Sequence, residues 1–137
     1  MKMNELDIGG AQPPIDGYAP SGFRIGGAFF EGALLLSEAG VARWLKEGAP
    51  TAPSALTAEA AAPLIALNGS IDVLLLGFGS DVAAAPQPFR APLTAVEAAP
   101  DGFGVDIMST PAACRTYNVL LAEGRRVAAA LLPTGGA

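Results

Sequence analysis

Histidine is absent from this sequence, and much of the familiar chemistry of enzymes is absent with it. Without imidazole there is no histidine general base, no Ser/His/Asp or Cys/His nucleophile system, and no metal site that requires a histidine ligand. The only cysteine, Cys114, excludes an internal disulfide and a thiolate cluster, which fits a reducing compartment. Most hydrolase mechanisms are therefore excluded, and we expect neither a metal ion nor a cofactor.

Charged residues are also scarce, at 15% of the chain, and basic residues are fewer than acidic ones. The 8 lysines and arginines against 13 aspartates and glutamates give a net charge of −5 at pH 7. Because the basic residues are scattered, they cannot neutralise a row of phosphates. Nucleic acid is therefore not expected as a partner.

Long hydrophobic runs are lacking too. The most apolar stretch, residues 71–78, is far shorter than the roughly 20 residues of a membrane-spanning helix. Residues 1–10 carry Glu5 and Asp7 and lack the apolar region of a secretory signal. These absences predict a cytoplasmic protein that does not span a membrane.

The sequence does contain enough apolar material for one folded domain. Hydrophobic residues make up 51% of its 137 residues, which is ample for a core. The first twenty residues are rich in glycine and proline, which break regular structure. We therefore predict a single domain over residues 1–137, with an arm or edge segment at 1–20, a core at 21–132 and a tail at 133–137.

Alternation in the first half predicts antiparallel strands. Residues 23–30 alternate between two faces and indicate one strand, with Phe23, Ile25, Gly27 and Phe29 on the same face. A tight turn at Glu31-Gly32 then leads to strands at residues 33–37 and 41–44. The N-terminal half is expected to be an antiparallel meander.

The second half alternates between helix and strand patterns. Helices are predicted after Thr57, over about residues 90–99, and over residues 111–123, where Thr110 is expected to cap the first turn. Strands are predicted at residues 71–77, 103–108 and 127–132. Strands that alternate with helices favour parallel pairing, so the class is α/β.

Polar and glycine residues gather where two of these strands end. The loop at residues 77–80 follows one strand and Ser109-Thr110 follows the next, and ligands bind at such carboxyl ends in open parallel sheets. Free backbone N–H groups at the start of helix 111–123 could hold a small anion or an acidic side chain of a partner. The candidate surface consists of Gly77, Gly79, Ser80, Ser109, Thr110, Arg115 and Asn118.

Two simpler interpretations of this surface remain open. A lone G-x-G usually marks a tight turn, and Val82 stands where a dinucleotide fingerprint needs glycine. Arg115 and Asn118 lie three residues apart on one helix face, where Arg115 could pair with a carboxylate and Asn118 could satisfy a loop carbonyl.

Cys114 is the one nucleophile of interest. The positive end of the helix and the neighbouring Arg115 would favour a thiolate. Its spacing from Tyr117 and Leu121, however, places it on the buried stripe of the helix, and a structural cysteine is the expectation. Asp106 lies inside a predicted strand without an assignable second carboxylate, so carboxylate catalysis is not expected.

Three segments together resemble a known family. They are Ile15-Asp16-Gly17-Tyr18 with Gly22-Phe23-Arg24-Ile25, then Leu74-Leu75-Leu76-Gly77-Phe78-Gly79, and Thr110-Pro111-Ala112-Ala113-Cys114-Arg115-Thr116-Tyr117-Asn118-Val119-Leu120 followed by Glu123-Gly124-Arg125-Arg126-Val127. The chain resembles the bacterial branch of a family of small domains of largely unknown function, which includes a mitochondrial respiratory complex I assembly factor and an adipogenesis-associated protein. The resemblance covers residues 15–132, and Phe78 departs from the smaller or hydroxyl residue expected there.

The resemblance implies a three-layer α/β domain with a mixed central sheet and no established catalytic activity. The first hypothesis is a non-catalytic protein-binding domain that assists assembly of a respiratory or membrane complex. Its expected partners are respiratory-complex or membrane-insertion components, bound by the candidate surface. The alternative is a small-molecule or anion-binding domain, or an unusual enzyme, that uses the N-terminus of helix 111–123.

Overall fold

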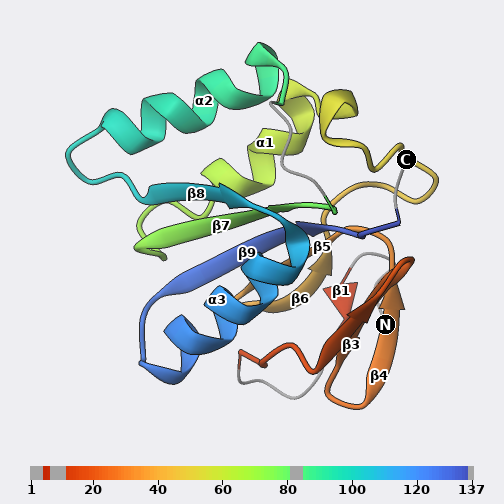
Figure 1. The fold of residues 1–137 in the computed structure, drawn as a ribbon. Helices are drawn as coiled ribbons and strands as arrows, with labels where there is room; N and C mark the ends of the chain where they lie inside the picture. The colour runs from red at the N-terminus through yellow and green to blue at the C-terminus, as the bar shows by residue number, and fades with distance from the viewer. Residues whose placement is uncertain (1–4, 7–11, 81–84, 136–137) are drawn as a thin grey trace.

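The structure is a computed structural model and describes residues 5–6, 12–80 and 85–135 (Figure 1). The predicted arm and tail fall in part outside the described residues, at 1–4, 7–11 and 136–137, as does Val82. No helix within the described ranges is long and apolar enough to cross a membrane.

A six-stranded sheet forms the middle of the molecule (Figure 1). Its strands, in spatial order, are β1 Glu5–Leu6, β6 Gly40–Arg43, β5 Leu34–Ser37, β9 Val127–Leu132, β7 Val73–Phe78 and β8 Gly104–Met108. β7 runs parallel to both β8 and β9, whereas β9 runs antiparallel to β5. The predicted mixed sheet with a parallel C-terminal part is confirmed.

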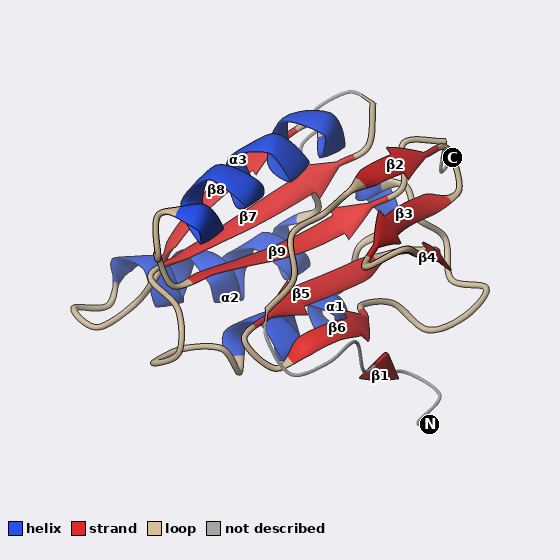
Figure 2. Cartoon of the chain, turned by 90° about the horizontal axis from the view of Figure 1, so that it is seen from below, coloured by secondary structure: helices blue, strands red, loops and turns tan. Residues whose placement is uncertain are grey.

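Different elements cover the two faces of this sheet. Helices α1 Ala58–Ile65 and α2 Gln87–Ala98 lie on one face, preceded by a short 3-10 turn at Pro53–Ala55. Helix α3 Thr110–Ala122 lies on the other face beside a small sheet, formed by β2 Gly17–Ala19, β3 Gly22–Ile25 and β4 Ala28–Glu31 (Figure 2). The three-layer α/β architecture expected from the resemblance is therefore confirmed.

Two hydrophobic clusters fill the spaces between the layers. One contains Leu74, Leu76 and Phe78 of β7 and lies under α1 and α2. The other contains Leu75 of the same strand and lies under α3 and the small sheet. Successive residues of a strand face opposite sides, so a strand covered on both faces must be apolar throughout. This requirement explains the uninterrupted hydrophobic sequences of β7 and β9.

The predicted strand over residues 23–30 is wrong, because it is broken in the middle into a hairpin. Gly26 and Gly27 have φ values of 62° and 84°, and consecutive residues with positive φ form the tight turn that joins β3 to β4. The chain therefore reverses before Glu31-Gly32. Phe23 pairs with Phe30, so Phe29 lies on the opposite face from Phe23 and not on the same one.

Candidate functional site

The hydroxyl of Thr110 joins the ends of three elements within the predicted surface. Its Oγ1 accepts a hydrogen bond of 2.8 Å from the Gly79 N–H and donates one of 2.6 Å to the Leu132 carbonyl. The Thr110 N–H in turn donates to the Gly79 carbonyl at 2.8 Å. Thr110 is fully buried, so its side chain ties β7, β9 and α3 together and is not available to a ligand.

The glycine loop at residues 77–80 packs against this joint. A Cβ added to Gly77 would lie 2.9 Å from Leu131 Cδ2 and 3.1 Å from the Thr110 Cα, so only glycine fits there without movement. Gly79 has a φ of 83°, and the Ser80 hydroxyl donates to the Thr134 carbonyl at 2.7 Å. The loop is therefore closed by its own neighbours rather than open toward a phosphate.

The start of α3 has few donors to offer an anion. Ser109, and not Thr110 as predicted, caps the helix, because the Thr110 hydroxyl is taken by Gly79. The Ser109 Oγ accepts from the Ala112 N–H at 3.4 Å and its carbonyl accepts from the Ala113 N–H at 2.9 Å. Pro111 has no N–H. Each N–H of the first turn thus has a partner, and this geometry gives no support to the anion-binding hypothesis.

Asn118 and Tyr117 hold the segment that precedes the small sheet. The Asn118 Oδ1 accepts from the Ile15 N–H, and its Nδ2 donates to the Ile15 carbonyl, both at 2.8 Å. The Tyr117 hydroxyl donates to the Pro13 carbonyl at 2.6 Å, and the Gln12 amide donates to the Val127 carbonyl at 2.7 Å. The open alternative, in which Asn118 satisfies a loop carbonyl, is the one observed.

Cys114 and Arg115 have different surroundings although they are neighbours in the chain. Cys114 is buried, as its spacing predicts, and burial raises the pKa of its thiol to about 11 in spite of the opposing charge of Arg115. The thiol is therefore protonated at neutral pH and is a poor nucleophile. Arg115 and Ser80 are the two exposed members of the predicted surface.

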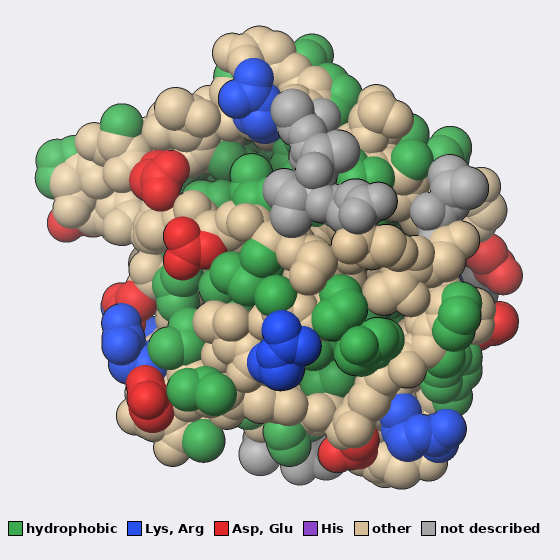
Figure 3. Space-filling view, viewed as in Figure 1, with side chains coloured by type: hydrophobic (Ala, Val, Ile, Leu, Met, Phe, Trp, Pro, Cys, Tyr) green, Lys and Arg blue, Asp and Glu red, His purple; other side chains and the backbone are tan. Residues whose placement is uncertain are grey.

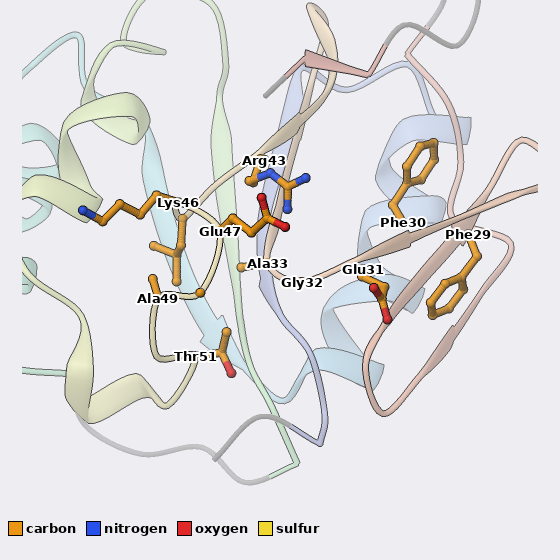
Figure 4. A pocket seen from close by; sticks show the side chains of 12 residues that line it. Phe29, Phe30, Glu31, Gly32, Ala33, Arg43, Lys46, Glu47, Ala49 and Thr51 are labelled. Carbon is orange, nitrogen blue, oxygen red and sulfur yellow. The ribbon is translucent and has the colours of Figure 1, made fainter. Parts of the chain in front are cut away.

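A cleft on another part of the molecule was not predicted. It has a volume of 430 Å³ and is lined by residues 29–33 on one side and by Arg43, residues 45–49 and Thr51 on the other (Figure 4). Phe29 on β4 lines this cleft and is 40% exposed. Charged groups of both signs, among them Arg43 and Glu47, line the space together with apolar side chains.

A second hollow, of 360 Å³, adjoins the first. It is lined by Trp44, Pro50 and Leu56 among others, and its wall includes Glu59 and Ala60 of α1. The two hollows share Leu45, Lys46 and Ala49 in their linings, and we call them together the double cleft.

The double cleft carries no recognisable catalytic set. Within the described ranges, no group of three or more aspartate, glutamate or cysteine side chains is placed to hold a metal ion. No buried side-chain nitrogen or oxygen of the described residues lacks a hydrogen-bond partner. The arrangement offers apolar contact and exposed charges, a composition that protein interfaces share.

Only one signal in the sequence could have indicated the cleft. Phe29 and Phe30 are adjacent in a strand, and adjacent strand residues face opposite sides, so both cannot be buried in one core. The opposite wall comes from the loop after β6, whose glycines and prolines predict a loop but not its path.

Comparison with known proteins connects this fold to a family. The family described as "Protein of unknown function (DUF498/DUF598)" matches residues 15–132. An uncharacterized protein of Rhodobacter capsulatus is 43% identical over 124 residues, which cover 90% of this chain and 87% of that protein.

A vertebrate protein and a solved structure are also similar. NADH dehydrogenase [ubiquinone] 1 alpha subcomplex assembly factor 3 of Danio rerio is 32% identical over 119 residues, which are 87% of this chain but only 63% of that protein. The crystal structure of an outer membrane protein from Bartonella henselae has a TM-score of 0.75 and 33% sequence identity, and covers 90% of this chain and 97% of its own.

Proposed function

We propose that this chain, which belongs to the DUF498/DUF598 family of proteins of unknown function, is a non-catalytic protein-binding domain in the cytoplasm. Its role is to assist the assembly of a respiratory or membrane complex. The similarity to a complex I assembly factor supports this role, and it extends over 63% of that protein.

The double cleft is the observation that carries the proposal. Its first hollow combines the exposed ring of Phe29 with charged groups on both walls. Protein interfaces commonly have this composition, in which aromatic anchors supply energy and a polar rim supplies specificity. Sites for compact small molecules usually enclose the ligand on most sides. A polypeptide segment of a complex component therefore fits the double cleft better than a small molecule does.

Arg115 and Ser80 form a second, smaller part of the proposal. They are the exposed members of the surface that the sequence predicts. Arginine is frequent in binding hot spots because its planar group makes several hydrogen bonds. Arg115 is proposed as an additional contact to the partner.

Affinity purification from the native host tests the proposal. The tagged protein is crosslinked mildly, and captured proteins are identified by mass spectrometry. The parent protein should capture subunits or assembly components of a respiratory or membrane complex. The amount of these proteins captured by the Phe29→Ala variant should be at least about tenfold lower, because an aromatic side chain buried in an interface contributes roughly 2 kcal/mol or more to binding.

Tyr18→Ala is the matched control. Tyr18 is an aromatic residue of the same small sheet and is 48% exposed, but it does not line the double cleft. This variant should capture the same proteins as the parent, and Arg115→Ala should show a partial loss. Equal capture by the Phe29→Ala variant and the parent would remove the double cleft from the account.

A further inference from the structure

The outer edge of β8 is available for pairing with another strand. β8 is the last strand of the six-stranded sheet, and β7 is the only strand that pairs with it in the described part of the chain. The Gly104 N–H donates to the backbone carbonyl of Asp72, the residue before β7, so the backbone groups of Gly104 point toward β7. Successive residues of a strand point their backbone groups to opposite sides, so those of Val105 and Ile107 point outward.

One of these outward groups is already engaged as an incoming strand would engage it. The Val105 N–H donates to Glu97 Oε2 of α2 at 3.1 Å. An exposed side-chain carboxylate here takes the place of a strand carbonyl, and such a contact is exchanged easily for a backbone one. The outward backbone groups of β8 are therefore oriented to form hydrogen bonds with the backbone of another strand.

A hollow with a mixed lining lies beside this edge. It has a volume of 120 Å³ and lies between α2 and β8, where Phe89 and Leu93 meet Val105 and Ile107 and where Arg90, Thr94 and Glu97 supply polar groups. The Ile107 side chain is 41% exposed. Figure 3 shows hydrophobic side chains in the hollow between these elements, with acidic and basic side chains next to it. The hollow has room for one aliphatic side chain of a neighbouring strand.

Charge indicates which kind of strand fits. Asp106 is exposed on the face of β8 opposite to Ile107, and Glu97 lies at the edge itself. A second copy of β8 in antiparallel register around Asp106 would bring two aspartates into opposition, which is unfavourable. A strand with lysine or arginine opposite Asp106 gains a cross-strand pair of opposite charges instead.

We propose that the outer edge of β8 binds an extended segment of a partner protein in which apolar residues alternate with lysine or arginine. The segment adds a strand to the central sheet. Its backbone pairs with Val105 and Ile107, an aliphatic side chain enters the hollow below α2, and a basic side chain pairs with Asp106. This site is separate from the double cleft and does not depend on it.

The test uses a synthetic peptide in which valine alternates with lysine. The isotope-labelled full chain is titrated, and amide resonances are followed by NMR together with hydrogen exchange. The peptide should shift the amides of residues 104–108 and protect the Ile107 amide. A peptide with glutamate in place of lysine should bind at least about tenfold more weakly, and Asp106→Lys should reverse this order.

Ile107→Pro removes the outward N–H but leaves the pairing with β7 intact, because that N–H does not face β7. It should abolish binding, whereas Ile107→Ala should only weaken it. Asp106→Lys, on the exposed face, keeps the test decisive if Ile107→Pro does not fold. The proposal is overturned if millimolar peptide shifts no β8 amide, if both peptides bind equally, or if sedimentation shows a dimer of the chain that Ile107→Pro dissociates.

Discussion

A single hydroxyl, that of Thr110, satisfies two backbone groups that have no access to water. Thr110→Val keeps the shape of the side chain but leaves the Gly79 N–H and the Leu132 carbonyl without this partner. Each buried polar group that loses its partner costs roughly 1 to 3 kcal/mol. We expect the free energy of unfolding to fall by about 2 to 4 kcal/mol, measured by urea denaturation.

Thr110→Ser is the control for this prediction, because it retains the hydroxyl and loses only a methyl group. Its expected cost is about 1 kcal/mol. If both variants lose the same stability, packing of the methyl group and not the hydrogen bonds holds the joint together.

Burial of Cys114 and Tyr117 makes the stability depend on alkaline pH. The pKa of Cys114 rises from 9.0 to about 11 and that of Tyr117 from 10.0 to about 12, in both cases because burial disfavours the anion. A group with a raised folded-state pKa stabilises the fold fully below its unfolded pKa and loses that contribution as the pH rises through the folded value. The free energy of unfolding should therefore decline between about pH 9 and pH 12.

Cys114→Ala isolates one part of this decline. The variant should be less stable at every pH because of the lost packing, but its stability should fall less between about pH 9 and pH 11 than that of the parent. Urea denaturation at several pH values measures both quantities. Parallel profiles for the two proteins would show that Cys114 titrates normally in the folded state.

At the scale of elements, side chains of α3 hold the chain segment before β2 in place by hydrogen bonds. The two hydrogen bonds between Asn118 and Ile15 link positions 103 residues apart in the sequence. Asn118→Ala should cost about 1 to 2 kcal/mol and should raise the exchange rate of the Ile15 amide at least about tenfold. Hydrogen exchange followed by NMR measures this rate.

Asn118→Asp separates the two bonds. The carboxylate still accepts from the Ile15 N–H but cannot donate to the Ile15 carbonyl, so we expect an intermediate loss of stability and a protected Ile15 amide. An Ile15 amide that exchanges at the parent rate in the Asn118→Ala variant would mean that Tyr117 and Gln12 hold the segment without it.

Most elements could be predicted from local sequence patterns, and the exceptions have physical causes. The strand β9 coincides with its prediction at residues 127–132, and α3 differs by one residue at each end from the predicted 111–123, because their signals are local. The break at Gly26-Gly27 was missed because the predicted strand continues its alternation through these two glycines. A Gly-Gly pair between two apolar runs favours a two-residue hairpin turn, because glycine adopts positive φ without strain, so this turn could have been predicted from the sequence.

At the scale of the whole molecule, the candidate site was much harder to predict than the fold. The predicted surface follows from a general rule for parallel sheets, but Thr110 and the glycine loop are used to close the structure there. The double cleft joins residues 29–33 to the loop after β6 and to α1. No local pattern in the sequence predicts that these segments meet, because the distance between them is set by the pairing of β5 with β6 in the folded sheet.

Protein binding at the double cleft is the central claim, and site-specific photocrosslinking tests it most directly. A photoreactive phenylalanine analogue replaces Phe29 in one version of the protein and Tyr18 in another, both in the native host. We predict a discrete adduct with a component of a respiratory or membrane complex from position 29 and none from position 18. No adduct at position 29, or the same adducts from both positions, would contradict the account.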